Sequence, residues 1–327
     1  MIPSAAQQEA RTILQHLIPA LHATGHWIRM AQPGVSRETK STRQEIAPTS
    51  IHNALTEVDL LAQQSLESSL RPFRDRLQAI GEEDTPYSLL HPPKEGNSHA
   101  LFCSIDPIDG TFAYCAGAED YCSMLACFDH RQFHWGAVHF PSLRESMIGS
   151  PEEGARVRKI VPHTTDLLDA HLEGGFEEQP YPKSSASEEK CIAVHYRFLL
   201  DPFRDRAARL MEQGFHFCTL AGEPSVDWAK PKLVGSNGAL LAEVLGGRAS
   251  AYVGPFTAFH DVAPLHCFFP SDACQFYDNQ RGPNHWKPVG LTEVLGQASQ
   301  QRHTRCRVIM TNDPAHLQLL QACLNEA

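Results

Sequence analysis

The sequence lacks several features that mark specialised classes of protein. Its ten cysteines include no CxxC pair, which argues against a zinc knuckle or a redox dithiol. No apolar run approaches the roughly 20 residues of a membrane span. The first residues show no basic region followed by an apolar core, so we expect no signal peptide. With no internal repeat and no low-complexity tract, the sequence predicts a cytoplasmic, globular protein with reduced thiols.

Excess positive charge is also missing. The chain has 28 lysines and arginines against 38 aspartates and glutamates, a formal net charge of −10. Because nucleic-acid binding depends on basic side chains that neutralise phosphates, this balance argues against a nucleic-acid polymer as partner. A small phosphorylated substrate stays possible, since bound metal ions can neutralise its charge locally. The 327 residues suffice for one large or two ordinary domains.

One acidic turn in the first half carries the strongest chemical signal. An apolar run predicts a buried strand, and residues 104–111 follow it with the sequence SIDPIDGT. The proline and the glycine turn the chain, so we expect the carboxylates of Asp106 and Asp109 and the carbonyl of Ile108 to converge. Such hard oxygen ligands suit Mg²⁺. A helix that begins after Gly110 would offer backbone N–H groups to a phosphate.

Three further carboxylates stand beside predicted elements. Asp59 opens an amphipathic helix, and Glu82 follows a short predicted strand over 77–80. Asp261 follows a predicted strand over 249–253 and a short turn. Each of them has an ordinary alternative as a helix cap or a solvated loop charge.

The pattern of predicted elements changes along the chain. A helix over 5–30 and a second helix precede a meander of antiparallel strands over 121–149, and strands alternate with helices in the second half. This order predicts an α+β part followed by an α/β part. We expect an N-terminal domain, 1–157, that carries the main metal-binding motifs. A C-terminal domain, 158–327, would carry Asp261 and the substrate-side pocket.

These motifs together resemble the inositol monophosphatase-like family of Mg²⁺-dependent, typically lithium-inhibited phosphatases. The family's D-P-[ILV]-D-G-T turn stands at 106–111, its G-E-E at 81–83 and its T-x-x-D at 56–59. Its W-D-x-A turn appears at 260–263 with histidine as the first residue. Four ordered motifs make the match specific. The resemblance implies a layered αβαβα sandwich like that of fructose-1,6-bisphosphatase.

The resemblance also implies a centre of two or three Mg²⁺ ions. The expected ligands of the first ion are Glu82, Asp106 and the carbonyl of Ile108. Those of the second ion are Asp106, Asp109 and Asp261. Asp59, together with Glu82, would reach a weaker third ion.

Catalytic and substrate-binding roles follow from the same resemblance. The residues expected to position the attacking water are Glu82, Thr111 and Asp59, with Asp59 orienting the Thr111 hydroxyl. Backbone N–H groups of Gly110 and Thr111 would contact the phosphate. The full set of expected substrate contacts is Asp109, Gly110, Thr111, Gly235, Asn237 and Asp261.

Two positions depart from the family pattern. His260 stands where the family has tryptophan before its last aspartate, and we expect the metal role of Asp261 to survive this change. Gly254 and Pro255 stand where many inositol phosphatases carry a glutamate that binds substrate hydroxyls. The second departure weakens an inositol substrate more than it weakens a phosphatase.

Other conspicuous side chains have structural explanations. His260 and His266 flank Asp261, but Mg²⁺ prefers oxygen, so we expect them to pack or to donate hydrogen bonds. Lys40, in a polar stretch over 33–50, is expected to be a surface charge. The cysteines expected to be small core residues on predicted strands are Cys103, Cys122 and Cys127.

The sequence therefore predicts a Mg²⁺-dependent phosphomonoesterase that acts on a small phosphorylated polyol, sugar or nucleotide through a metal-activated water. Homodimers are usual among the proteins it resembles, so we expect one here. Within the family, a 3′(2′),5′-bisphosphate nucleotidase or a sugar or histidinol phosphate phosphatase is the alternative. Outside it, a non-catalytic metal- or phosphate-binding protein would be marked by loss of a ligand carboxylate, and none is lost. An acidic scaffold protein that binds partners through 33–50 has only composition in its favour.

Overall fold

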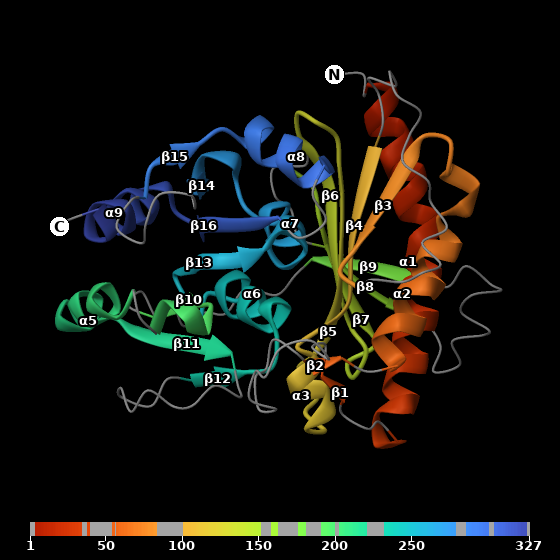
Figure 1. Cartoon of the computed structure of the whole chain (residues 1–327), viewed down its shortest axis with the longest axis horizontal. Coiled ribbons are helices and arrows are strands. Elements are labelled where there is room, and N and C mark those ends of the chain that lie inside the picture. Colours follow the sequence, from red (N-terminus) through yellow and green to blue (C-terminus); the bar gives the residue numbers. More distant parts are fainter. Residues whose placement is uncertain are drawn as a thin grey trace.

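A computed structural model describes residues 4–34, 38–39, 54–55, 57–83, 101–151, 158–162, 176–180, 191–199, 203–220, 232–278, 286–300 and 304–325. Two seven-stranded sheets form the frame of this part of the chain, with helices outside and between them (Figure 1). The predicted αβαβα layering is therefore confirmed. Lys40 lies outside the described residues.

The first sheet has the strand order β3-β4-β5-β6-β7-β8-β9. Its strands are β3 (Leu77–Gly81), β4 (Leu101–Asp109), β5 (Cys122–Phe128), β6 (Phe133–Phe140), β7 (Glu145–Gly149), β8 (Arg158–Pro162) and β9 (Phe176–Pro180). β3 and β4 are parallel, and each later pair is antiparallel. The helices α1 (Ala5–Ala31) and α2 (Glu57–Ser69) cover the outer face (Figure 1). The predicted N-terminal helix and meander are thus confirmed.

Both faces of the first sheet are buried along β4, β5 and β6, and the alternation of side chains along β4 decides which face carries the acidic turn. Leu101 and Cys103 pack against the outer helices. Phe102 packs into the centre of the molecule, between the two sheets. Because side chains alternate along a strand, Asp106 shares the central face with Phe102.

The second sheet has the order β12-β11-β10-β13-β16-β14-β15. Its strands are β10 (Cys191–Val194), β11 (His216–Leu220), β12 (Lys232–Val234), β13 (Ala251–Ala258), β14 (Cys274–Tyr277), β15 (Pro288–Val289) and β16 (Arg305–Thr311). The first four in spatial order are parallel, and the others pair antiparallel. The outer face packs against α5 (Arg204–Glu212) and α9 (Pro314–Asn325) (Figure 1).

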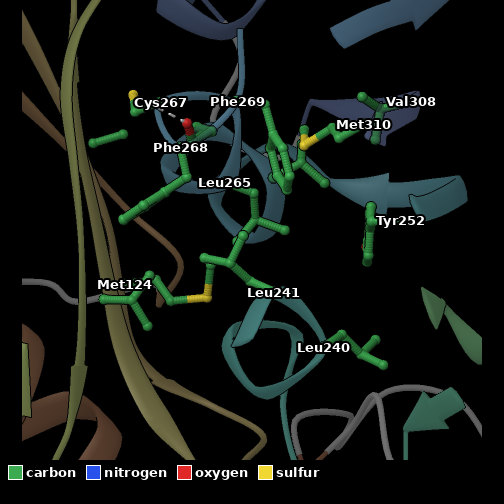
Figure 2. Packing of buried hydrophobic residues seen from close by; sticks show 14 of the residues in the cluster. Met124, Leu240, Leu241, Tyr252, Leu265, Cys267, Phe268, Phe269, Val308 and Met310 are labelled. Atoms are coloured by element: carbon green, nitrogen blue, oxygen red, sulfur yellow. Dashed lines mark hydrogen bonds between the residues drawn. The ribbon is translucent and has the colours of Figure 1, made fainter. Parts of the chain in front are cut away.

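Helices α6 (Asn237–Leu245) and α7 (Phe259–His266) lie between the sheets, and α8 (Leu291–Gln300) adds to the same core. Figure 2 shows Met124 of β5, Leu241 of α6 and Tyr252 of β13 in this central core. The ring of Phe259 lies 5.2 Å from that of Phe128 on β5, centroid to centroid. This contact fixes the first turn of α7 against the first sheet.

A close approach also locates α7 over β6. A Cβ added to Gly136 would lie 2.4 Å from the carbonyl oxygen of Pro264, so this position on β6 admits no side chain without a shift. Together with the ring contact at Phe259, it places α7 against β5 and β6 on the central face of the first sheet.

Some local predictions were wrong. The strand before the acidic turn continues to Asp109 instead of ending near residue 103. The strand before Asp261 continues to Ala258, and Asp261 lies in the first turn of helix α7, so the short turn predicted between them is absent among the described residues. The polar stretch over 165–190, whose composition indicates a surface excursion or a domain boundary, contains the unpredicted strand β9. Among the described residues, no helix has both the length and the apolar character needed to cross a membrane.

Strand pairing bears on the division into domains. β8 and β9 extend the first sheet, beyond the predicted boundary after residue 157. We propose that the N-terminal domain includes both strands and that the boundary falls between Pro180 and Cys191.

Candidate metal and phosphate site

Four carboxylates converge where the first sheet meets α7. Glu82 directly follows β3, Asp106 and Asp109 belong to β4, and Asp261 lies in the first turn of α7. One oxygen each from Asp106, Asp109 and Asp261 lie within 4.8 Å of one another. A second group with the same spacing contains Glu82, Asp106 and a ring nitrogen of His260. Asp106 belongs to both groups, so the two candidate cation sites are adjacent.

An irregularity in β4 explains how its two aspartates come together. β4 pairs regularly with β5 up to Asp106, and the register shifts between Asp106 and Asp109. In a regular strand, residues three apart point to opposite faces, so the shift is needed to bring both carboxylates to one side. Glu82 joins them because its backbone N–H donates to the carbonyl of Ile105 at 2.9 Å.

The four carboxylates are crowded and poorly solvated. Burial raises the pKa of Asp106 well above its usual range, and the charges of Glu82, Asp109 and Asp261 raise it further. Burial also raises the pKa of Asp109 to about 6 and that of Asp261 to about 6. Ionised carboxylates this close repel one another unless cations lie among them.

The donor set fits divalent cations. Oδ1 of Asp106 is buried and has no hydrogen-bond partner among the described residues. An ionised oxygen left in that state is costly, and a coordinated ion would satisfy it. Since the group of Asp106, Asp109 and Asp261 offers only oxygen, it has the chemistry that Mg²⁺ requires.

Asp109 is held in place from α6 and β5. The side-chain amide of Asn237 donates to Oδ1 at 3.0 Å, and the backbone N–H of Gly238 donates to Oδ2 at 2.8 Å. The Cys122 thiol also donates to Oδ2, at 3.4 Å. The Tyr252 hydroxyl donates to Oδ1 of Asn237 at 3.2 Å. Asn237 therefore orients Asp109, and its contact with substrate stays a prediction.

The Thr111 hydroxyl lies between two acceptors. It is 3.3 Å from Oδ1 of Asp59 and 3.0 Å from the carbonyl oxygen of Ile108. The contact between Asp59 and Thr111 is the one that the resemblance implied. Asp59 is fully buried in the first turn of α2 and belongs to neither group of converging ligands among the described residues. Its share in a third ion stays a prediction, as does the ligand role of the Ile108 carbonyl.

A short helix begins beside these carboxylates. α3 (Thr111–Cys115) has Gly110 as its N-cap residue. The first N–H groups of a helix have no acceptor within that helix, so they can bind phosphate oxygens. This agrees with the arrangement expected for Gly110 and Thr111, and their phosphate contacts stay a prediction.

The two halves of the chain touch at Gly110. Its φ is 87°, and an added Cβ would lie 2.3 Å from the carbonyl oxygen of Gly235. Gly235 itself donates its N–H to the carboxylate of Asp120, and the Ser236 hydroxyl donates to the Asp120 carbonyl at 2.6 Å. Gly235, expected to contact substrate, thus joins the start of α6 to the loop before β5.

We expect Gly110→Ala to destabilise the fold by about 3 kcal/mol. A left-handed conformation costs a non-glycine residue about 1–2 kcal/mol, and the clash with Gly235 adds about as much. Gly117→Ala is the matched control, because Gly117 also has positive φ, 77°, but has nothing within 4 Å of an added Cβ. Urea unfolding of both variants measures the difference, and equal losses would contradict the close approach.

Several residues that shape the site belong to none of the sequence motifs. Gln63 on α2 receives a hydrogen bond from the Glu83 backbone N–H at 2.8 Å and donates to the Glu83 carbonyl at 3.0 Å. It therefore fixes the chain immediately after Glu82. The sequence offered one indication of this role: Gln63 lies four residues after Asp59, one helical turn along the same face of α2. Cys122 and Gly238 offered no such signal.

The two histidines near Asp261 differ in their surroundings. His266 packs between aromatic rings, 4.8 Å from Phe133 and 5.4 Å from Phe276, which confirms the predicted packing role. His260 instead faces the carboxylates. Its Nε2 lies 3.5 Å from Oδ1 of Asp261 and 3.9 Å from Oε1 of Glu82.

Comparison with solved structures shows the same fold. A Thermotoga maritima IMPase is 19% identical, with 94% of each chain covered and a TM-score of 0.60. Staphylococcal inositol monophosphatase-1, in an inhibitory complex soaked in 100 mM LiCl, is 16% identical over 98% of this chain and 96% of that chain, with a TM-score of 0.61. An IMPase/NADP phosphatase complexed with NADP and Ca²⁺ is 17% identical over the same shares, also with a TM-score of 0.61.

Comparison of the sequence with curated proteins finds no match. The sequence profile of the inositol monophosphatase family, however, matches residues 9–269, which include all four converging carboxylates. Membership in this family implies a phosphatase. The chain belongs to the inositol monophosphatase family.

Proposed function

We propose that this protein is a Mg²⁺-dependent phosphomonoesterase that releases phosphate from a small phosphorylated polyol, sugar or nucleotide by attack of water. The observation that carries the proposal is the convergence of Glu82, Asp106, Asp109 and Asp261 beside the first turn of α3. Divalent cations held there would polarise the phosphoryl group and lower the pKa of the attacking water.

The residues themselves would bind and orient the reactants. Backbone N–H groups at the start of α3 would hold phosphate oxygens next to the carboxylates. The Thr111 hydroxyl can donate to Asp59 or to the Ile108 carbonyl, so its oxygen is left to accept a hydrogen bond from water. Asp59 would thereby fix the direction in which that water points. No protein nucleophile is needed in this scheme.

The identity of the substrate depends on the residues that bind its alcohol part, the group from which phosphate is released. Solved relatives include a dual IMPase/NADP phosphatase bound with D-inositol-1-phosphate and the same type of enzyme with NADP. Gly254 provides no carboxylate for substrate hydroxyls where many inositol phosphatases have glutamate. We therefore favour a phosphorylated polyol, sugar or nucleotide in general over inositol monophosphate in particular.

A substrate screen tests the proposal directly. The purified protein, stripped with EDTA and reloaded with Mg²⁺, should release phosphate from at least one member of a panel that contains inositol 1-phosphate, NADP, 3′-phosphoadenosine 5′-phosphate, histidinol phosphate and fructose 1,6-bisphosphate. The EDTA-treated protein should release none, and Li⁺ should inhibit. Absence of release across the panel would favour the non-catalytic binding protein. Light scattering on the same preparation tests the expected homodimer.

A further inference from the structure

The two groups of converging ligands differ in chemistry. The group of Asp106, Asp109 and Asp261 contains only carboxylate oxygens, whereas the group of Glu82 and Asp106 includes a ring nitrogen of His260. His260 stands where the family motif has tryptophan, whose indole N–H can only donate a hydrogen bond. The substitution therefore adds a metal-binding nitrogen to the group of Glu82 and Asp106, whereas the group of Asp106, Asp109 and Asp261 offers only oxygen.

The position of the imidazole suits a ligand. The His260 side chain is nine-tenths buried, and its Nε2 lies 3.9 Å from Oε1 of Glu82 and 3.5 Å from Oδ1 of Asp261. Both separations exceed the 2.7–3.2 Å typical of an N–H···O hydrogen bond. Two ligands that are each about 2.1 Å from one ion lie roughly 3 to 4 Å apart. The nitrogen and the Glu82 oxygen are thus spaced as two ligands of one ion.

The neighbouring carboxylate supplies a second, independent sign of a ligand. Asp106 belongs to both groups, and its Oδ1 is buried and has no hydrogen-bond partner among the described residues. A cation between Asp106 and His260 would satisfy this oxygen.

We propose that the centre is asymmetric. The site formed by Glu82, Asp106 and His260 takes a divalent first-row transition ion such as Mn²⁺, and the site formed by Asp106, Asp109 and Asp261 takes Mg²⁺. The inference deepens the proposed function, on which it rests. Its chemical basis is that imidazole suits transition ions, whereas Mg²⁺ prefers an all-oxygen shell.

Manganese is the probe of choice, because its electron spin reports bound nitrogen directly. The full-length protein is stripped with EDTA and loaded with one equivalent of Mn²⁺ in the presence of excess Mg²⁺. Electron spin echo spectra should show modulation from a coordinated ¹⁴N in the wild-type protein and none in His260→Gln. Titration calorimetry should show that His260→Gln weakens Mn²⁺ binding at least about tenfold and changes Mg²⁺ binding by less than about threefold.

Two further variants separate ligand loss from general damage. His26→Gln removes an exposed imidazole on α1 and should keep both the ¹⁴N modulation and the Mn²⁺ affinity. His260→Trp introduces the residue of the family motif and should lose the Mn²⁺ preference while it retains Mg²⁺ binding. If His260→Gln does not fold, the wild-type spectrum and His260→Trp still decide.

The outcomes distinguish this inference from the proposed function. An enzyme that hydrolyses phosphomonoesters with Mg²⁺ but shows no ¹⁴N modulation would overturn the asymmetric centre alone. Equal Mn²⁺ affinities of wild type and His260→Gln would do the same. A protein that shows the modulation but releases no phosphate would instead refute the phosphatase and leave the metal assignment standing.

Discussion

Asp106→Asn is expected to lower kcat/KM by about 10³-fold or more and, in the same protein, to raise the melting temperature of the metal-free form. Asp106 is the carboxylate that the two candidate cation sites share. Losing it would remove several kcal/mol of stabilisation of the transition state, and about 4 kcal/mol corresponds to a factor of about 10³.

The gain in stability has a separate cause. Burial and the charges of Glu82, Asp109 and Asp261 raise the pKa of Asp106, so its ionised form is unfavourable in the metal-free fold. An amide of the same shape carries no charge, and its NH₂ group can donate to the carboxylates around it. Activity and stability therefore move in opposite directions.

Asp109→Asn is the matched comparison. Both oxygens of Asp109 already accept hydrogen bonds, from Asn237, Gly238 and Cys122. An amide there would turn an NH₂ group toward a donor, whichever way it rotates, and leave buried polar groups unsatisfied. We expect this variant to lose activity as well, and its metal-free form to melt below that of Asp106→Asn.

Phosphate-release kinetics and thermal melts in EDTA measure both variants. If Asp106→Asn were as active as the wild type, the shared carboxylate would have no role in catalysis. If the metal-free form of Asp109→Asn melted as high as that of Asp106→Asn, the contrast between a carboxylate with an unsatisfied oxygen and a fully bonded one would be wrong.

Local signals predicted the helices, the strands and the acidic turn, whereas the layering of the fold and the convergence of the four carboxylates were implied by the resemblance to a known family. The spacing of apolar residues set the helix over 5–30 and the antiparallel meander. The turn at 106–111 combines proline, glycine and two aspartates, which limits the conformations it can adopt. Four motifs in the order of a known family then placed Asp261 beside them.

Contacts that depend on the register between strands could not be predicted in this way. Cys122 reaches Asp109 because the two pair across β4 and β5 after the register shift. Nothing in the sequence marks where that shift falls. β9 was missed for a related reason: its sequence, FEEQP, has little intrinsic preference for a strand, and pairing with β8 decides its structure.

His260 illustrates a third kind of limit. The preference of Mg²⁺ for oxygen is a property of the ion, and it predicted packing or hydrogen bonding for both histidines near Asp261. That reasoning holds for His266, which is stacked between rings. For His260, the direction of the side chain is set by the docking of α7 on the first sheet, which the sequence does not encode locally.

The stabilisation of the protein by Mg²⁺ is expected to grow steeply as the pH rises from 5 to 7.5. The pKa values of Asp109 and Asp261 are raised to about 6 in the fold, against the usual 3.8, first of all by burial. The folded state therefore binds protons more tightly than the unfolded state. Without metal, stability therefore falls as the pH rises from about 3.8 to about 6.

Cations reverse this penalty, because they bind the ionised carboxylates that protons would otherwise neutralise. The experiment compares melting temperatures with Mg²⁺ and with EDTA at each pH. Two buried histidines have the opposite pH dependence: burial lowers the pKa of His22 to about 4 and that of His139 well below its usual range, which costs stability at low pH. The difference between the melting temperatures with Mg²⁺ and with EDTA removes this contribution, because it is the same in both. Both histidines contact the Ser146 hydroxyl of β7 on the α1 side of the first sheet, opposite the face that carries the carboxylates, so we expect Mg²⁺ to leave their contribution unchanged.

We expect Mg²⁺ to raise the melting temperature by about 5 °C or more at pH 7.5 and by almost nothing at pH 5, where protons compete with the ion. Asp106→Asn, which lacks the shared ligand, should show little rise at either pH. A rise of equal size at both pH values would mean that Mg²⁺ binds outside the carboxylate cluster. Because this test needs no substrate, it decides whether the cluster is a cation site even if the physiological phosphomonoester is missing from the panel.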